Sequence, residues 1–173
     1  SFIGGIKKDY YSEGIDVHAS SIIKARKTKT HDRYRVGDAR QLDKYYKPKS
    51  FDLVMATDFI EHLKKPDALR VIKKMEIISR KKVIILTPNG FRYQGHYDNN
   101  PHQDHKSGWT KRDLERHGYK VYGLRGLKAV RGEFASIKYR PWIIWGFIAF
   151  ITEPVLYYLP SLSYSLFAVK DTS

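Results

Sequence analysis

The stretch FDLVMATDFIEHL, residues 51–63, decides the fold. Its first six residues form an apolar run that follows the turn residues of 47–50, and such a run predicts a strand. The run leads directly into Thr57 and Asp58. An acidic residue at the carboxyl end of a strand is the feature with which an open α/β sheet holds a ribose or a base. The stretch therefore predicts an α/β fold with a ligand at this edge of the sheet.

Two earlier acidic residues stand in the same position, each at the end of a short apolar run. They are Asp16 in the sequence GIDV and Asp38 in the sequence VGDA. A carboxylate at Asp16 can accept hydrogen bonds from both hydroxyls of a ribose, with Val17 against an adenine face. A carboxylate at Asp38 can accept from an adenine amino group, with the Ala39 amide beside it. Either aspartate is equally compatible with a plain turn residue, because Asp is common in turns.

Strands and helices alternate along the rest of the chain. The pattern predicts strands at 10–16, 34–36, 51–56, 83–86, 119–124 and 164–169, and helices at 1–8, at 20–27, after Pro66 and at 111–116. Thr110 and Asp113 have the spacing of a capping box before the last of these helices. This order predicts a mostly parallel sheet with crossover helices.

Composition narrows the class of protein. The 173 residues fit one domain, and no cysteine is present for a disulfide or a thiolate metal site. The chain does not open on a signal peptide, which predicts a cytoplasmic protein. The net charge of +14 suits an anionic partner, but the lysines are scattered in pairs rather than gathered. We therefore do not expect a nucleic-acid partner.

The run from Ile15 to Val121 resembles a class I S-adenosylmethionine-dependent methyltransferase of the type that acts on small molecules. The segments that carry the resemblance are 14–16, 37–39, 51–63, 83–89 and 109–121, and 51–63 is the most specific of them. The resemblance implies a Rossmann-like, doubly wound, mostly parallel sheet with an antiparallel last strand. It implies methyl transfer from S-adenosylmethionine to a small-molecule oxygen, nitrogen or carbon acceptor, lipid-like acceptors included.

The same resemblance assigns cofactor-binding residues. Asp16 and Val17 would hold the ribose and adenine, and Asp38 and Ala39 the adenine edge. Thr57 and Asp58 would lie against the methionine end. The family's first strand and glycine-rich loop have no counterpart, so we expect residues 1–173 to be a single domain truncated at its N-terminus. For that reason we expect this chain to bind the cofactor weakly or not at all.

Four histidines are candidates for a catalytic base, which is needed only if the acceptor must lose a proton. They are His62, His96, His102 and His105. For His62 we favour helix packing beside Glu61 over a catalytic role. The other three share one loop, but their spacing matches no standard metal-ligand pattern, so we expect no metal.

The last notable segment is an apolar, aromatic insertion at about 138–160. It is too short to span a bilayer before Glu153 and Pro154 interrupt it. Flanking basic residues and two tryptophans suit a helix lying at an anionic membrane surface, and a helix that covers the sheet or a lipophilic pocket fits equally well. The residues for membrane contact would be Trp142, Trp145, Phe147 and Phe150.

Two other functions stay open at this stage. An NAD(P)-dependent Rossmann oxidoreductase also places an acid at the end of its second strand, but it requires a glycine-rich loop upstream. A non-enzymatic domain that binds membrane surfaces would use the basic charge and the aromatic insertion. Asp38 and the Glu61-His62-Leu63 sequence favour the methyltransferase.

Overall fold

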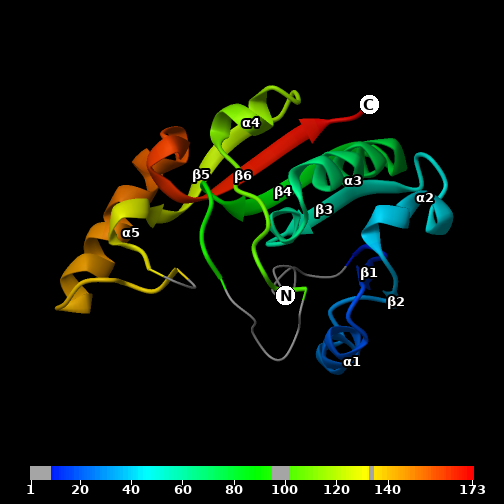
Figure 1. The fold of residues 1–173 in the computed structure, drawn as a ribbon, viewed down its shortest axis with the longest axis horizontal. Coiled ribbons are helices and arrows are strands. Elements are labelled where there is room, and N and C mark those ends of the chain that lie inside the picture. Colours follow the sequence, from blue (N-terminus) through cyan, green and yellow to red (C-terminus); the bar gives the residue numbers. More distant parts are fainter. Residues whose placement is uncertain (1–8, 95–101, 133–134) are drawn as a thin grey trace. The chain divides into compact units, whose positions relative to one another are not determined.

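The computed structural model describes residues 9–94, 102–132 and 135–173 (Figure 1). It divides into two compact units, Ser1–Tyr46 and Lys47–Ser173, which are described separately below. The helix predicted at residues 1–8 lies outside the described residues.

The first unit is built on two parallel strands, β1 (Glu13–Asp16) and β2 (Arg33–Val36). Helix α1 (Ala19–Thr28) connects them, followed by the 3₁₀ turn η1 (Ala39–Gln41) and the short helix α2 (Leu42–Tyr45). A βαβ connection of this kind is what the sequence predicts. Strand β1 starts three residues later than the predicted 10–16.

Polar contacts reinforce the sheet of the first unit. The Glu13 carboxylate accepts from Arg35 Nε at 3.1 Å and from the Tyr46 hydroxyl at 2.7 Å. Burial and the hydrogen bond to Glu13 raise the pKa of Tyr46 to about 12. The residue after α2 is thereby fastened to the first strand, which closes the unit.

The second unit contains a sheet of four strands in the order β3-β4-β6-β5 (Figure 1). These are β3 (Phe51–Thr57), β4 (Ser79–Pro88), β5 (Lys120–Leu127) and β6 (Ser163–Asp171). Strand β3 is parallel to β4, whereas β6 is antiparallel to both β4 and β5. Strands β3, β4 and β5 therefore run in one direction. The predicted Rossmann-like fold, mostly parallel with an antiparallel last strand, is confirmed.

The second unit has three α-helices among its described residues. They are α3 (Lys65–Ile78), α4 (Lys111–Glu115) and α5 (Trp142–Tyr158), and the 3₁₀ turns η2 (Ile60–His62), η3 (Lys128–Val130) and η5 (Pro160–Leu162) complete the connections. Helix α3, predicted after Pro66, buries an apolar face that includes Ile72 and Met75. The capping box predicted for Thr110 and Asp113 is present at the start of α4.

Helix α5 corrects the prediction that the aromatic segment is interrupted at Glu153 and Pro154. The helix continues through Pro154 for a further turn and ends at Tyr158. A proline lacks the N–H that would bond the carbonyl four residues earlier. Packing against β5 holds α5 nevertheless: Tyr157 stacks on Tyr122 at 4.6 Å between ring centroids, and Leu156 is buried.

Candidate functional site

Asp16 ends strand β1 with its carboxylate half-buried, and it behaves partly as a turn residue. Its Oδ1 accepts a hydrogen bond from the backbone N–H of His18 at 2.7 Å. Its second oxygen makes no hydrogen bond within the described part of the chain. The neighbouring Val17 is 42% exposed. Asp16 thus keeps acceptor capacity beside an uncovered apolar side chain.

Asp38 follows strand β2 and caps the turn η1, where Ala39 is the first residue. Its carboxylate accepts from the Arg40 backbone N–H at 2.8 Å. The Arg40 guanidinium also binds both carboxylate oxygens, at 2.6 to 3.0 Å. An exposed ion pair of this kind contributes little stability, so a ligand can displace it at small cost. Sequence reasoning missed Arg40, although its position two residues after Asp38 was a visible signal.

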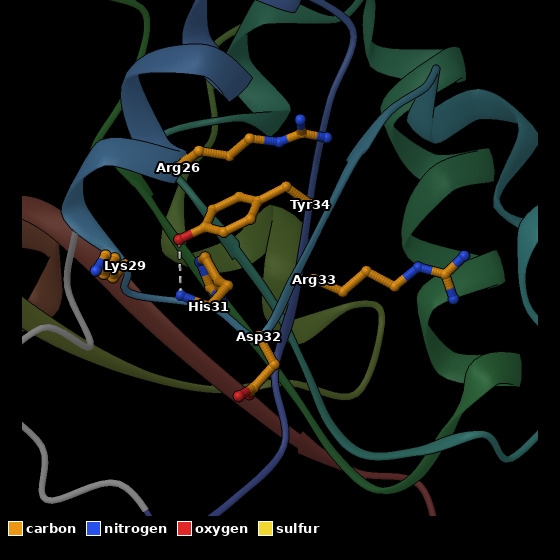
Figure 2. A pocket seen from close by; sticks show the side chains of 6 residues that line it. All are labelled: Arg26, Lys29, His31, Asp32, Arg33 and Tyr34. Atoms are coloured by element: carbon orange, nitrogen blue, oxygen red, sulfur yellow. Dashed lines mark hydrogen bonds between the residues drawn. The ribbon is translucent and has the colours of Figure 1, made fainter.

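The first unit has an open hollow of about 620 Å³, and the predicted cofactor residues do not line it (Figure 2). Its lining residues are Arg26, Lys29, His31, Asp32, Arg33 and Tyr34. Figure 2 shows the backbone N–H of His31 donating to the Tyr34 hydroxyl, at 2.9 Å. Arg33 begins β2, whereas Asp16 ends the parallel strand β1. The hollow therefore belongs to the opposite edge of this small sheet from the predicted site.

In the second unit, Thr57 ends β3 and Asp58 follows it in a left-handed conformation with φ of 47°. The Asp58 N–H donates to the Leu86 carbonyl at 2.8 Å, which fixes the turn. The Asp58 carboxylate pairs with both terminal nitrogens of Arg125, at 2.8 and 3.0 Å. The side chains of Thr57 and Asp58 are exposed. Asp58 is thus held by a cation from a strand far along the chain.

Glu61, in the turn η2, is a buried carboxyl group that was not among the predicted site residues. It is 2% exposed, and its Oε2 accepts from the Thr87 hydroxyl at 2.8 Å. Its Oε1 is buried without a hydrogen-bond partner among the described residues. Burial raises the pKa of Glu61 to about 7, against the opposing effect of its hydrogen bonds.

The candidate histidines differ in their surroundings. His62 is buried, and burial lowers its pKa from the ordinary value. His105 is half-buried with its ring 5.0 Å from the His62 ring, centroid to centroid. His102 is exposed, and His96 lies outside the described residues. The structure therefore brings together His62 and His105, the two candidates from distant parts of the sequence.

Helix α5 leaves most of its aromatic side chains in solvent. Trp142, Phe147 and Phe150 are 62% to 74% exposed. Trp145 instead is half-buried and packs on Tyr139, with 5.3 Å between ring centroids. None of the helices that the structure describes is long and apolar enough to cross a membrane.

Part of the chain matches a known domain family. Residues 7–86 match the family model of the methyltransferase domain. The match runs from before β1 to near the end of β4 and includes all six residues predicted to bind the cofactor. No curated protein matches the sequence.

Solved structures share the fold at low sequence identity. A SAM-dependent methyltransferase from Archaeoglobus fulgidus is 17% identical with a TM-score of 0.56, and the match covers 92% of this chain and 75% of that one. The PH0226 protein from Pyrococcus horikoshii is 16% identical with a TM-score of 0.55, covering 94% and 72%. A phosphoethanolamine N-methyltransferase from Haemonchus contortus, in complex with S-adenosylmethionine, is 16% identical with a TM-score of 0.50, covering 91% and 42%.

The domain match over residues 7–86 and the shared fold support the predicted resemblance to class I S-adenosylmethionine-dependent methyltransferases. S-adenosylmethionine, the predicted cofactor, is the cofactor of this class. The comparisons give no support to an NAD(P)-dependent oxidoreductase.

Proposed function

We propose that this protein transfers the methyl group of S-adenosylmethionine to a small-molecule acceptor. The observation that carries the proposal is the methyltransferase-domain match over residues 7–86, which contains the three strand ends marked by Asp16, Asp38 and Asp58. The sulfonium methyl is already electrophilic, so the protein's task is to align the acceptor and exclude water.

The residues of the first unit fit the adenosine part of this cofactor. Asp16 has an oxygen with acceptor capacity for a ribose diol, and Val17 offers an exposed apolar surface to a base. Asp38 can exchange its solvent-accessible Arg40 contact for an adenine amino group, with the Ala39 amide as the neighbouring donor. We assign Thr57 and Asp58 of the second unit to the methionine part, where Arg125 neutralises the Asp58 carboxylate.

An acceptor that loses a proton needs a base, and His62 and His105 are the candidates. Each donates from Nδ1 to a backbone carbonyl, of Asp104 at 3.3 Å and of Arg92 at 2.7 Å. A carbonyl can only accept, so each Nδ1 carries hydrogen and each neutral ring keeps its lone pair on Nε2. The lowered pKa of His62 favours that neutral form.

NMR titration with S-adenosylmethionine tests the cofactor assignment, because it also detects weak binding. We expect the cofactor to shift the backbone amide signals of residues 16–18 and 38–40. Asp16→Asn should weaken the binding about tenfold or more, since a hydrogen bond to a charged group contributes roughly 1.5–3 kcal/mol. Asp9→Asn, the same change at an exposed site of the same unit, should not. Unchanged signals at saturating cofactor, or equal effects of the two variants, would overturn the assignment.

We further propose that α5 rests on an anionic membrane surface, which would bring the protein to a lipid-like acceptor. Eight apolar side chains of α5 are more than half exposed: Trp142, Ile143, Ile144, Phe147, Phe150, Ile151, Val155 and Tyr158. Large exposed apolar surfaces usually mark interaction sites. The exposed Lys138 and Arg140 precede the helix, and the net charge is +14, which complements anionic lipid.

Co-sedimentation with vesicles of phosphatidylcholine and phosphatidylglycerol tests this second proposal. We expect binding that weakens as salt rises and is lost in the Phe147→Ser/Phe150→Ser variant. Ile151→Ser on α5 and Ile77→Ser on α3 form a matched pair, because the two isoleucines are 51% and 47% exposed. Only the α5 change should reduce binding. Absence of binding at both low and high salt would refute the proposal, as would equal loss in the matched pair.

A further inference from the structure

Three potential metal ligands meet beside the turn η2. Their ligand atoms, a carboxylate oxygen of Glu61 and ring nitrogens of His62 and His105, all lie within 4.8 Å of one another. Glu61 and His62 are neighbours in the sequence, whereas His105 comes from the segment before α4. The N–H groups of Lys106 and Ser107 donate to the Glu61 carbonyl at 2.8 and 3.0 Å, which holds that segment in place.

The two imidazole rings make the hydrogen bonds that metal-binding histidines usually make. His62 and His105 each donate their Nδ1–H to a backbone carbonyl, at 3.3 and 2.7 Å. A histidine that binds a metal usually donates its other ring nitrogen in this way, and the bond fixes the tautomer and the ring orientation. Both rings therefore present an Nε2 lone pair.

Glu61 supplies the independent observation that points to a ligand. The residue is 2% exposed, its Oε2 is bound to Thr87, and its Oε1 has no partner among the described residues. A buried carboxylate oxygen without a partner is costly, and such groups are commonly explained by an ion or by function. The two lone pairs of the imidazoles cannot satisfy a carboxylate oxygen, but a cation satisfies all three groups at once.

We propose that Glu61, His62 and His105 bind a divalent first-row transition metal ion such as Zn²⁺. Two imidazoles and one carboxylate form a known ligand set for Zn²⁺ and for non-haem Fe²⁺. Metal–ligand bonds of about 2.0–2.1 Å in tetrahedral geometry place the ligand atoms roughly 3.3 Å apart. The ligand atoms here lie within 4.8 Å of one another, so side-chain movements that shorten each separation by about 1.5 Å or less complete the site. Mg²⁺ and Ca²⁺ prefer oxygen ligands and should bind poorly. Three protein ligands leave coordination positions for water or for an acceptor oxygen.

This proposal does not depend on the assignment of the cofactor residues, but it competes with a base role for the two histidines. Both roles use the same Nε2 lone pairs, so a metal-bound ring cannot accept a proton. The metal is favoured because a base needs only one imidazole, whereas here ring nitrogens of two histidines lie within 4.8 Å of a buried carboxylate oxygen.

Cobalt is the probe for the test, because Co²⁺ replaces Zn²⁺ and reports its ligands by absorption. The tag-free full chain is first treated with a chelator and then titrated with Co²⁺ and, separately, Zn²⁺ by calorimetry. We expect one site per chain and a rise in melting temperature with either ion. Mg²⁺ should give neither. Wild-type protein that binds no Co²⁺ or Zn²⁺ at this stoichiometry would overturn the proposal, and would instead favour a protonated Glu61 bonded to one of the rings.

The sequence has seven histidines, two of which belong to this cluster. Matched variants separate the cluster from the other histidines. His105→Ala should weaken Co²⁺ binding at least a hundredfold, and Glu61→Gln at least tenfold. His102→Ala, the same change at an exposed position three residues away, should leave the affinity unchanged. Circular dichroism verifies that each variant is folded, and His105→Gln replaces His105→Ala if that variant is not. Equal affinity of the His105 and His102 variants would refute the assignment.

Discussion

Gly123 occupies the place where α5 comes closest to β5. A Cβ built at this position would lie 2.2 Å from the carbonyl oxygen of Leu156 and 2.7 Å from the Cβ of Ser163. Neither atom can rotate away. The Leu156 oxygen belongs to the backbone, and the Ser163 Cβ is bonded directly to the backbone of a fully buried residue. Restoring ordinary contact requires α5 to move roughly 1 Å away from the sheet.

The Gly123→Ala variant should therefore lose stability. Inserting one methyl group into a tightly packed core costs about 1–3 kcal/mol, occasionally more, and this contact is with backbone. We expect the free energy of unfolding to fall by about 3 kcal/mol. Gly146 provides the matched control, because it lies within α5 with nothing within 4 Å of a built Cβ. There the same change should raise stability by about 0.5–1 kcal/mol, since alanine is the better helix former.

Urea unfolding followed by tryptophan fluorescence measures the stability of the second unit, where both glycines lie. All three tryptophans, Trp109, Trp142 and Trp145, belong to Lys47–Ser173. The two glycine variants should shift the unfolding midpoint in opposite directions. Shifts of the same sign and size would refute the argument that α5 packs on β5 at Gly123.

Three further predictions concern polar groups of the second unit. Asn89→Asp should lower the free energy of unfolding by about 3 kcal/mol or more. The Asn89 amide nitrogen donates at 2.9–3.0 Å to three carbonyl oxygens, which a carboxylate would repel. A urea midpoint within error of wild type would contradict this. Thr110→Ala should cost about 1 kcal/mol by loss of the helix cap, measured in the same way, and no loss would rule out the capping box in solution. Burial acts to raise the pKa of Asp113, but hydrogen bonds from Thr110 and Lys65 outweigh it and hold the pKa below its ordinary value. The stabilisation from Asp113 is therefore complete above the pKa of this group in the unfolded chain, and it is lost as the pH falls through the pKa in the folded protein. Wild type and Asp113→Asn should thus converge in stability at acid pH. A difference in stability that stays constant with pH would contradict this linkage.

The sequence predicts most of the second unit because local signals and burial agree there. The continuous apolar run at 83–86 became the middle of β4, a strand paired on both sides. Thr110 and Asp113 formed the capping box that their spacing predicts. Helix α5 was less predictable, because a proline normally ends a helix and only tertiary packing on β5 explains its continuation.

The candidate site was predicted less completely, for a physical reason. Sequence spacing locates the ends of strands but not which distant residue reaches them. Arg125, which binds Asp58, is 67 positions away and lies at an irregularity of β5 with φ of 65°. Similarly, His105 lies near His62 in a segment whose next two residues, Lys106 and Ser107, donate to the Glu61 carbonyl. The burial of Glu61 had one signal, its position within the apolar sequence FIEHL.

The charges of Asp58, Glu61 and Arg125 in the second unit influence one another. Asp58 and Glu61 are two carboxyl groups three residues apart, and the negative charge of Asp58 acts to raise the pKa of Glu61 while the Arg125 charge acts to lower it. Arg125 neutralises Asp58 directly, through two hydrogen bonds. The Oε1 of Glu61 has no hydrogen-bond partner among the described residues, and ring nitrogens of two histidines lie within 4.8 Å of a carboxylate oxygen of this residue. A single divalent ion would meet the needs of both the carboxylate and the rings, and it would stand close to the strand end assigned to the methionine part of the cofactor.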